Sequence, residues 1–238
     1  MALLTLNGVP IIRGNIRMPR VGVWNADLTL DSTTAITGPV TLATADGAFS
    51  LAGTAYREGV FLGTLSLRVI GGAGGLSVAP GGLGKLLPAK YYQGATLGLV
   101  LSDTLTSCGE KLSAKSDAAV TGLFLTKWTR LAGTGKQAIA RMLDNIATSW
   151  RVLADGTVWV GTDTYPAAPN SQFDVLERHF GEGRIVIGVQ QPFLMPGTLL
   201  TISSSATSGT QNVSTVTYDI RPDKIRAEVW FERAGLQS

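Results

Sequence analysis

Three long stretches of this sequence carry no charged side chain, and they constrain the fold and its surroundings more than any motif does. Residues 185–218 lack Asp, Glu, Lys, Arg and His, and residues 32–45 and 69–84 are uncharged as well. These stretches are rich in Ser, Thr, Gly and Gln, which favour a surface over a core. Another protein can cover an uncharged polar surface without desolvating a charge. The pattern therefore predicts contact between subunits, with a merely bland surface as the alternative.

The overall charge is low for a chain of 238 residues. Charged residues make up 16% of the sequence, against about 25% in an average soluble domain. The 20 basic residues form no run, so a nucleic-acid-binding surface is not indicated. The nearest approach to a basic cluster is Arg13, Arg17 and Arg20, which we interpret as the solvated edge of a strand.

Residues 1–70 predict an N-terminal β domain of antiparallel strands and tight turns. Asn7-Gly8 separates two apolar runs, which is a strong hairpin signal, and Asp46-Gly47 marks a second turn. Pro10 moves the second strand towards a sheet edge, because proline has no N–H to donate. The alternation of Ala26, Leu28 and Leu30 with polar neighbours indicates a half-buried strand. We expect an antiparallel sheet or a small barrel here.

Residues 71–95 are interpreted as a glycine-rich linker without bulky anchors, and residues 96–165 as a segment with both helices and strands. Five apolar residues recur at helical spacing behind Thr96, a suitable N-cap, and Gly109 predicts that this helix stops early. A second helix is predicted from about residue 135 to 149, capped by Thr134. The apolar residues of the first helix are Leu97, Leu101, Leu105, Cys108 and Leu112.

A hairpin follows directly, because Asp155-Gly156 lies between Trp150-Arg151-Val152-Leu153 and Thr157-Val158-Trp159-Val160. Residues 166–238 then predict further strands that form the C-terminal part of a β-barrel, with residues 203–211 as a mobile loop tip. The predicted fold class is mainly β (α+β), with small antiparallel β-barrel domains and two central α-helices.

Few residues suggest catalysis, and we expect no catalytic, cofactor-binding or metal-ligating residue and no cofactor. The lone histidine, His179, lies in a predicted strand, and the lone cysteine, Cys108, lies on an apolar helix stripe. The Gly-Lys pairs lack the Ser or Thr of a phosphate-binding loop. A glycosidase needs only two acids brought together by the fold, so a hidden carboxylate pair stays open. The acids considered for it are Glu110, Asp117, Asp144 and Asp155.

The tryptophans bear on ligand binding, and the N-terminal residues and apolar stretches bear on targeting. Tryptophans could form a sugar-binding surface, although core packing is their commoner use. These are Trp24, Trp128, Trp150, Trp159 and Trp230. The first residues lack a basic region, which argues against a signal peptide, and the apolar stretches are too short to span a membrane.

The stretch from Thr96 to Phe231 resembles the tail-hub, or late-control, family of contractile-tailed bacteriophages. The resemblance rests on the predicted helix from Leu97, on the helix-and-hairpin block from Gly135 to Val160, and on the order of the closing strands. In those strands Leu194-Met195-Pro196-Gly197-Thr198 leads through Val213-Ser214-Thr215-Val216 to Ile225-Arg226-Ala227-Glu228-Val229.

The resemblance implies a non-enzymatic virion component, a baseplate hub that joins the tail tube to the central spike. It also implies a homotrimer whose chains carry two related barrels, with tube, spike and other baseplate proteins as partners. Neither specific nucleic acid binding nor membrane insertion is expected, and the protein would assemble in the host cytoplasm before residing in the tail. The alternatives are another tail protein, such as a tube or distal-tail subunit, a carbohydrate-binding module, and a wall-degrading enzyme.

Overall fold

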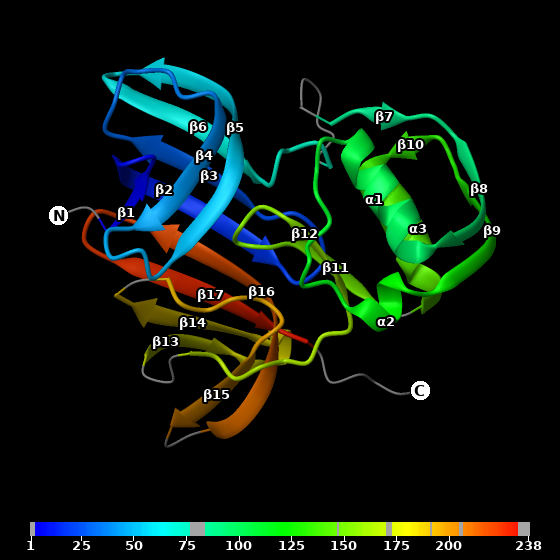
Figure 1. Ribbon diagram of the computed structural model, residues 1–238. Coiled ribbons are helices and arrows are strands. Elements are labelled where there is room, and N and C mark those ends of the chain that lie inside the picture. The colour runs from blue at the N-terminus through cyan, green and yellow to red at the C-terminus, as the bar shows by residue number, and fades with distance from the viewer. Residues whose placement is uncertain are drawn as a thin grey trace.

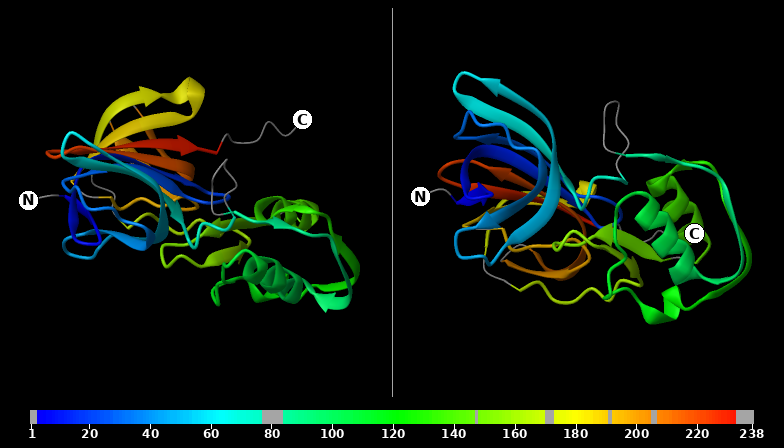
Figure 2. Two further views of the ribbon diagram at one scale, coloured as in Figure 1. Left: turned by 90° about the horizontal axis from the view of Figure 1, so that it is seen from above. Right: turned by 45° about the horizontal axis from the view of Figure 1, so that its top comes forward.

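The computed structural model describes residues 3–76, 84–146, 148–169, 173–190, 192–204 and 207–232. Its strands gather in a closed barrel and a sheet that continues from it, while most of the helical residues lie in a lobe to one side (Figure 1). Two turned views show the same separation of lobe and barrel (Figure 2). The expectation of a mainly β fold with a small antiparallel barrel and few helices is confirmed.

Six antiparallel strands form the closed barrel at the N-terminal end of the chain. Their order is β1-β4-β5-β6-β3-β2, and pairing of β1 with β2 completes the circle. Alternate side chains point inward, so Leu28 and Leu30 are buried, as their period of two predicts. The strands are β1 (Leu4–Leu6), β2 (Val9–Pro19), β3 (Asn25–Leu30), β4 (Gly38–Thr44), β5 (Ser50–Phe61) and β6 (Thr64–Gly71).

The sheet continues beyond the barrel through β2, which pairs on its far half with β16. The order is then β16-β17-β14-β13, and β15 pairs with the first half of β16. A short 3-10 turn, η2 (Phe180–Glu182), connects β13 to β14. The strands are β13 (Asp174–His179), β14 (Arg184–Val189), β15 (Leu199–Ser204), β16 (Thr207–Ile220) and β17 (Ile225–Phe231).

Two expectations for the strands are wrong. Strand β2, which carries Pro10, is central rather than at an edge; the proline is tolerated because it lies near the strand start, where a bulge follows between Ile11 and Arg13. Residues 203–211, expected as a loop tip, belong largely to β15 and β16, since Ser and Thr pair as readily in strands as in loops. Residues 205 and 206 lie outside the described residues.

The inserted lobe packs two helices against strand ribbons and returns to the barrel through a hairpin (Figure 1). Strand β8 pairs with β9, β7 with β10, and β11 with β12. The elements are β7 (Leu86–Leu87), β8 (Lys90–Thr96), α1 (Leu97–Ser107), α2 (Ala118–Thr121), β9 (Phe124–Arg130), β10 (Gly133–Thr134), α3 (Gly135–Leu143), η1 (Asp144–Ile146), β11 (Ser149–Val152) and β12 (Val158–Gly161).

Both predicted helix caps are present. The Thr96 side chain accepts the N–H of Leu99, and helix α1 ends at Ser107, short of Leu112 as Gly109 predicted. Thr134 and Gln137 form a reciprocal capping box at the start of α3. The second helix is shorter than expected, because α3 ends at Leu143 and passes into a 3-10 turn. The hairpin at Asp155-Gly156 is confirmed by the pairing of β11 with β12.

Part of the glycine-rich segment is anchored to the rest of the protein, contrary to the expectation of a linker without anchors. Leu76 is buried, and the Glu110 carboxylate accepts the N–H groups of Ala73 at 3.0 Å and Gly75 at 2.9 Å. A Cβ at Gly75 would overlap the carbonyl oxygen of Cys108, so the chain passes here as closely as glycine allows. Strand β7 and all but the last residue of β8 also lie within the range 71–95. Residues 77–83 fall outside the described residues, and the domain boundaries stay a prediction.

Hairpin β11–β12 is held to the barrel by main-chain hydrogen bonds. Gly22 donates to the carbonyl of Trp150 at 2.8 Å and accepts from the N–H of Val152 at 3.0 Å, while Ala52 donates to Ala154 at 2.7 Å. Trp150 and Val152 are buried with the barrel core. The hairpin thus fixes the inserted lobe beside one end of the barrel.

Two hairpins of the barrel use two-residue turns with the same backbone shape. In the first, Asn7 and Gly8 have φ of 50° and 83°, and in the second, Leu62 and Gly63 have φ of 48° and 77°. Asparagine tolerates this left-handed region and is the usual residue there, whereas leucine is not. The β5–β6 turn therefore holds a residue that local backbone preference does not select.

Candidate assembly surfaces

A carboxylate at the junction of barrel, inserted hairpin and C-terminal sheet gathers two arginines. Asp163, whose side chain is 4% exposed, accepts from Arg20 Nη1 at 2.6 Å and from Arg151 Nη1 at 2.5 Å. Arg20 also donates to the Ser149 hydroxyl at 2.5 Å and pairs with Glu232 at 2.7 Å. These five residues, here the Asp163 network, come from four separate parts of the chain.

Two opposing effects act on the pKa of Asp163. Burial alone would raise it, but the hydrogen bonds from Arg151, Arg20 and Ser149 outweigh burial and hold the pKa below its ordinary value. The carboxylate is therefore charged at neutral pH, and it keeps the guanidinium groups paired inside the junction. This arrangement fixes segments and leaves no carboxyl proton at neutral pH for acid chemistry.

A cavity of about 340 Å³, the junction cavity, opens beside this network. Its charged side chains are paired with each other, because Arg151 pairs with Asp163 and lies over the ring of Trp159 at 4.2 Å. The remaining wall is mainly apolar and suits an apolar side chain. Its apolar lining residues are Met18, Pro19, Trp24, Leu51, Val152, Leu153, Ala154, Trp159, Pro166, Met195 and Pro196.

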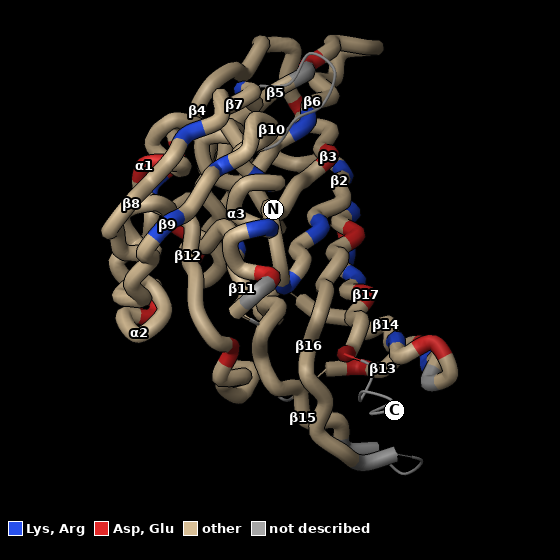
Figure 3. The backbone as a smooth tube through the Cα atoms, turned by 90° about the vertical axis from the view of Figure 1, so that its right-hand side faces the viewer, with Lys and Arg blue, Asp and Glu red and all other residues tan. Residues whose placement is uncertain are grey.

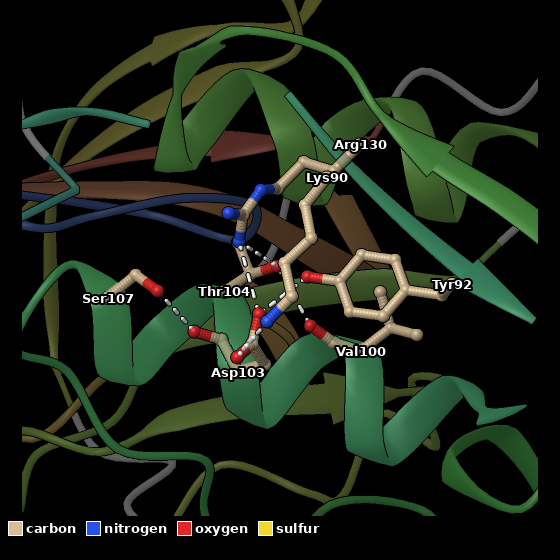
Figure 4. Close-up of polar contacts among 7 residues, drawn as sticks. All are labelled: Lys90, Tyr92, Val100, Asp103, Thr104, Ser107 and Arg130. Carbon is tan, nitrogen blue, oxygen red and sulfur yellow. Dashed lines mark hydrogen bonds and ion pairs between the residues drawn. The ribbon is translucent and has the colours of Figure 1, made fainter. Parts of the chain in front are cut away.

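The inserted lobe holds a second polar cluster, centred on Asp103 of α1 (Figure 4). Asp103 accepts from Lys90 Nζ at 2.8 Å and from the Tyr92 hydroxyl at 2.5 Å, and Arg130 Nη1 lies 3.4 Å away. Hydrogen bonds from Lys90 and Tyr92 lower the pKa of Asp103, and burial raises the pKa of Tyr92 to about 12. The cluster ties ribbon β8–β9 to α1 and has no free base or nucleophile at neutral pH.

The four acids considered for a carboxylate pair have separate structural roles. Asp117 caps α2, Asp155 accepts from Thr157 in its turn, and Asp144 begins η1. Glu110 is buried beneath the glycine-rich segment, where burial raises its pKa despite the N–H groups that it accepts. Of these four acids, Glu110 and Asp155 line a common groove of about 530 Å³.

The lone histidine and the lone cysteine were the other candidates for a chemical role. His179 lies in β13, as predicted, beside Glu177 at 3.3 Å, and Cys108 is buried. Among the described residues, no group of three or more His, Cys, Asp or Glu side chains could hold a metal ion. Within the same ranges, no helix is long and apolar enough to cross a membrane.

The structure separates the tryptophans that the sequence left undivided. Trp24 and Trp150 are buried in the core, and Trp128 is partly buried against it. Trp159 is covered by the Arg151 guanidinium, while Trp230 is exposed on β17 near Arg184. Of these side chains only Trp230 is among the exposed large hydrophobic residues, and a sugar-binding surface usually needs more than one free ring face.

Charges are concentrated on part of the surface. Lys, Arg, Asp and Glu positions follow β2, β3 and β17 and the outer ribbon of the lobe, whereas the described part of β15 and its partner stretch of β16 carry none (Figure 3). Of the three arginines read as a solvated edge, Arg13 bonds the Thr29 hydroxyl on the sheet surface at 3.3 Å, but Arg20 belongs to the Asp163 network.

Two parts of the molecule carry most of the exposed large apolar side chains. The tip of hairpin β5–β6 presents Val60, Phe61 and Leu62 in succession. The lobe presents scattered positions, which are Leu86, Tyr91, Leu99, Leu123, Phe124 and Leu131. Sequence reasoning missed the hairpin tip and the Asp163 network. The leucine before Gly63, where Asn is usual, was the available signal for the first, and no local signal exists for the second.

The fold that combines the barrel, its continuing sheet and the side lobe is similar to that of solved phage tail proteins. No protein-family model and no curated protein matches the sequence. A tail protein from Neisseria meningitidis MC58 matches with a TM-score of 0.68 and 12% identity over 98% of this chain and 97% of its own. The 43 kDa tail protein of prophage MuSo2 from Shewanella oneidensis matches with a TM-score of 0.62 and 10% identity, over 97% and 95%.

A third similar structure is the Escherichia coli c3393 protein, a component of the type VI secretion system with structural similarity to the T4 tail proteins gp27 and gp5. It matches with a TM-score of 0.67 and 11% identity over 99% of this chain and 80% of its own. At these identities the likeness establishes the fold alone.

Proposed function

We propose that this chain is a structural component of a phage-type tail, a baseplate hub that joins the tail tube to the central spike. The observation that carries the proposal is the fold match, which spans 97% or more of this chain in each of three tail-assembly proteins. A match of that extent includes barrel, continuing sheet and inserted lobe together. Of the uncharged stretches, residues 32–39 are mostly exposed and support the proposal, because permanent protein interfaces avoid charge at their centres, whereas residues 69–76 are mostly buried inside the chain.

The site geometry favours a mechanical role over a chemical one. The carboxylates of Asp103 and Asp163 accept hydrogen bonds from side chains within the chain and so tie its segments together. Such clusters give a rigid body that transmits load between neighbours. In the proposed assembly three copies surround the tail axis, with the tube on one side and the spike on the other, inside a virion assembled in the host cytoplasm.

The test is the copy number in solution and in the particle. Light scattering of the purified chain at micromolar concentration should give a trimer, and binding to purified tube and spike proteins should require that trimer. A ring of six would instead favour a tube or distal-tail subunit. A stable monomer that binds neither partner would contradict the proposal.

A further inference from the structure

We propose that the β5–β6 hairpin tip of one chain inserts Phe61 and Leu62 into the junction cavity of a second copy. This inference rests on the proposed assembly function and names the contact that would join neighbouring copies. We call Val60, Phe61 and Leu62 the hairpin knob.

The knob is built to be covered. Phe61 is 72% exposed and Leu62 is 86% exposed, at the far end of a hairpin that extends beyond the barrel (Figure 1). No charge occurs between Glu58 and Arg68, so the tip can enter an apolar site without desolvating one. Three adjacent large apolar residues on a protruding tip are costly in water and indicate an interaction surface.

The sequence of the β5–β6 turn also indicates an interaction surface. The first hairpin of this barrel fills the left-handed position with Asn7, at φ 50°, and the second fills it with Leu62, at φ 48°. The Thr64 hydroxyl donates to the Phe61 carbonyl at 2.9 Å and stabilises the turn without help from leucine. Departures from a local rule tend to occur at functional sites, and here the departure places an apolar side chain at the outermost point.

The junction cavity is the matching socket. Its volume of about 340 Å³ suits one or two apolar side chains, and Met18 and Met195 in its wall can adapt to an incoming shape. The Asp163 network beside it is internally paired, so its charged groups need no partner from outside. The grooves beside β2 and beside Glu110 fit less well, because more of their lining is charged, whereas the two charged residues of the junction cavity, Arg151 and Asp163, pair with each other.

A second copy is the occupant because each chain carries both halves of the contact at different places. A cyclic assembly requires two different patches on every chain, one for each neighbour. The knob lies at the free end of β5–β6, and the socket lies where barrel, hairpin β11–β12 and the 195–198 segment meet. Since the two sites are distinct, one chain can donate a knob and accept another at once.

The first test replaces Leu62 with Asn, the residue that the equivalent turn already uses. Leu62→Asn should fold as well as the wild type, with an unchanged or higher melting temperature at concentrations where both are monomeric. It should raise the concentration at which the trimer dissociates to monomer by at least 10-fold. Leu86→Asn is the matched control, because it removes a leucine of 75% exposure from the lobe. It should leave the trimer intact.

The second test blocks the socket from its rim. Thr164 is exposed and lines the cavity mouth, so Thr164→Trp should fill the space without disturbing the core. That variant alone should be monomeric. An equimolar mixture with Leu62→Asn should give dimers and nothing larger, because only one knob and one socket remain. A mixture that stays monomeric would overturn the proposed contact.

Cross-linking gives a readout that does not depend on the blocking variant. Leu62→Cys chains mixed with Thr164→Cys chains should be joined by a short bismaleimide, since the native Cys108 is buried. If Leu62→Asn still forms the trimer and the two cysteine variants give no cross-link, the knob contact is overturned and the hub proposal is unaffected. A monomeric wild type would overturn the knob contact, and one that also binds neither tube nor spike protein would overturn the hub proposal.

Discussion

Asp163 and Glu110 are two buried carboxylates whose surroundings have opposite effects. Asp163 meets two guanidinium groups, which outweigh its burial, whereas Glu110 meets only main-chain N–H groups, which do not. The pKa of Asp163 is therefore lowered and that of Glu110 is raised. Both hold segments that are distant in the sequence, and neither could be assigned this role from its neighbours along the chain.

Replacing Asp163 with Asn should lower the free energy of unfolding by about 3 kcal/mol, because it leaves the largely buried Arg151 without a carboxylate partner and removes one of the two carboxylates that pair with Arg20. Urea unfolding at pH 7 measures this loss. Asp27→Asn is the control, since its ion pair with Arg68 is exposed and should cost about 0.5 kcal/mol. Equal losses in the two variants would contradict a structural role for the network.

The same carboxylate gives a pH dependence of known sign. Because the folded-state pKa of Asp163 is lowered, its stabilisation is present above the unfolded value of about 3.9. It is lost as the pH falls through the folded-state pKa. The difference in unfolding free energy between wild type and Asp163→Asn should therefore shrink as the pH is lowered from 5 towards 2, and a constant difference would argue against it.

At the scale of elements, local chemistry predicted local structure. Asn7-Gly8, Thr96, Thr134 and Asp155-Gly156 stand where a hairpin or a helix begins, and each performs the expected role. The pairings that close the barrel and extend its sheet, β1 with β4 and β2 with β16, join residues far apart in sequence. No local pattern specifies them, because any half-buried strand offers the same alternation.

The glycine-rich segment shows where composition misled. Glycine predicted freedom, but residues 72–76 use it for close packing against the end of α1. Gly75→Ala should therefore destabilise the protein by at least about 2 kcal/mol, because the added methyl meets the Cys108 carbonyl. Gly59→Ala, with open space around it, should change stability by less than about 1 kcal/mol. Thermal unfolding of the two variants measures the difference. Close packing at Gly75 predicts a larger loss for Gly75→Ala, whereas a flexible linker predicts similar small changes in both.

The capping box of α3 should contribute to the free energy of unfolding by an amount typical of a helix N-cap. Thr134→Ala removes the acceptor for the Gln137 N–H, 3.1 Å away, and should cost about 1 kcal/mol. Denaturant unfolding measures the change in midpoint. Thr134→Ser keeps the hydroxyl and should recover most of the loss; an alanine variant as stable as the wild type would mean that packing alone holds the helix.

At the scale of the whole molecule, the fold combines a closed barrel, an open sheet with an uncharged end, and a lobe clamped by Asp163. The sequence predicted that neutral surface would be covered by other subunits, and the structure adds a place where an apolar tip and an apolar cavity occur on one chain. Ionisable groups inside the chain are used to hold it rigid. Such a molecule is suited to being held between neighbours.

The central claim is that this chain works as one of several copies in a closed assembly. Light scattering coupled to size-exclusion chromatography at micromolar concentration measures it most directly. For a trimer we expect a molar mass about three times the 25.0 kDa of the chain. A single sharp species at 25.0 kDa, stable on its own across the concentration range, would contradict it.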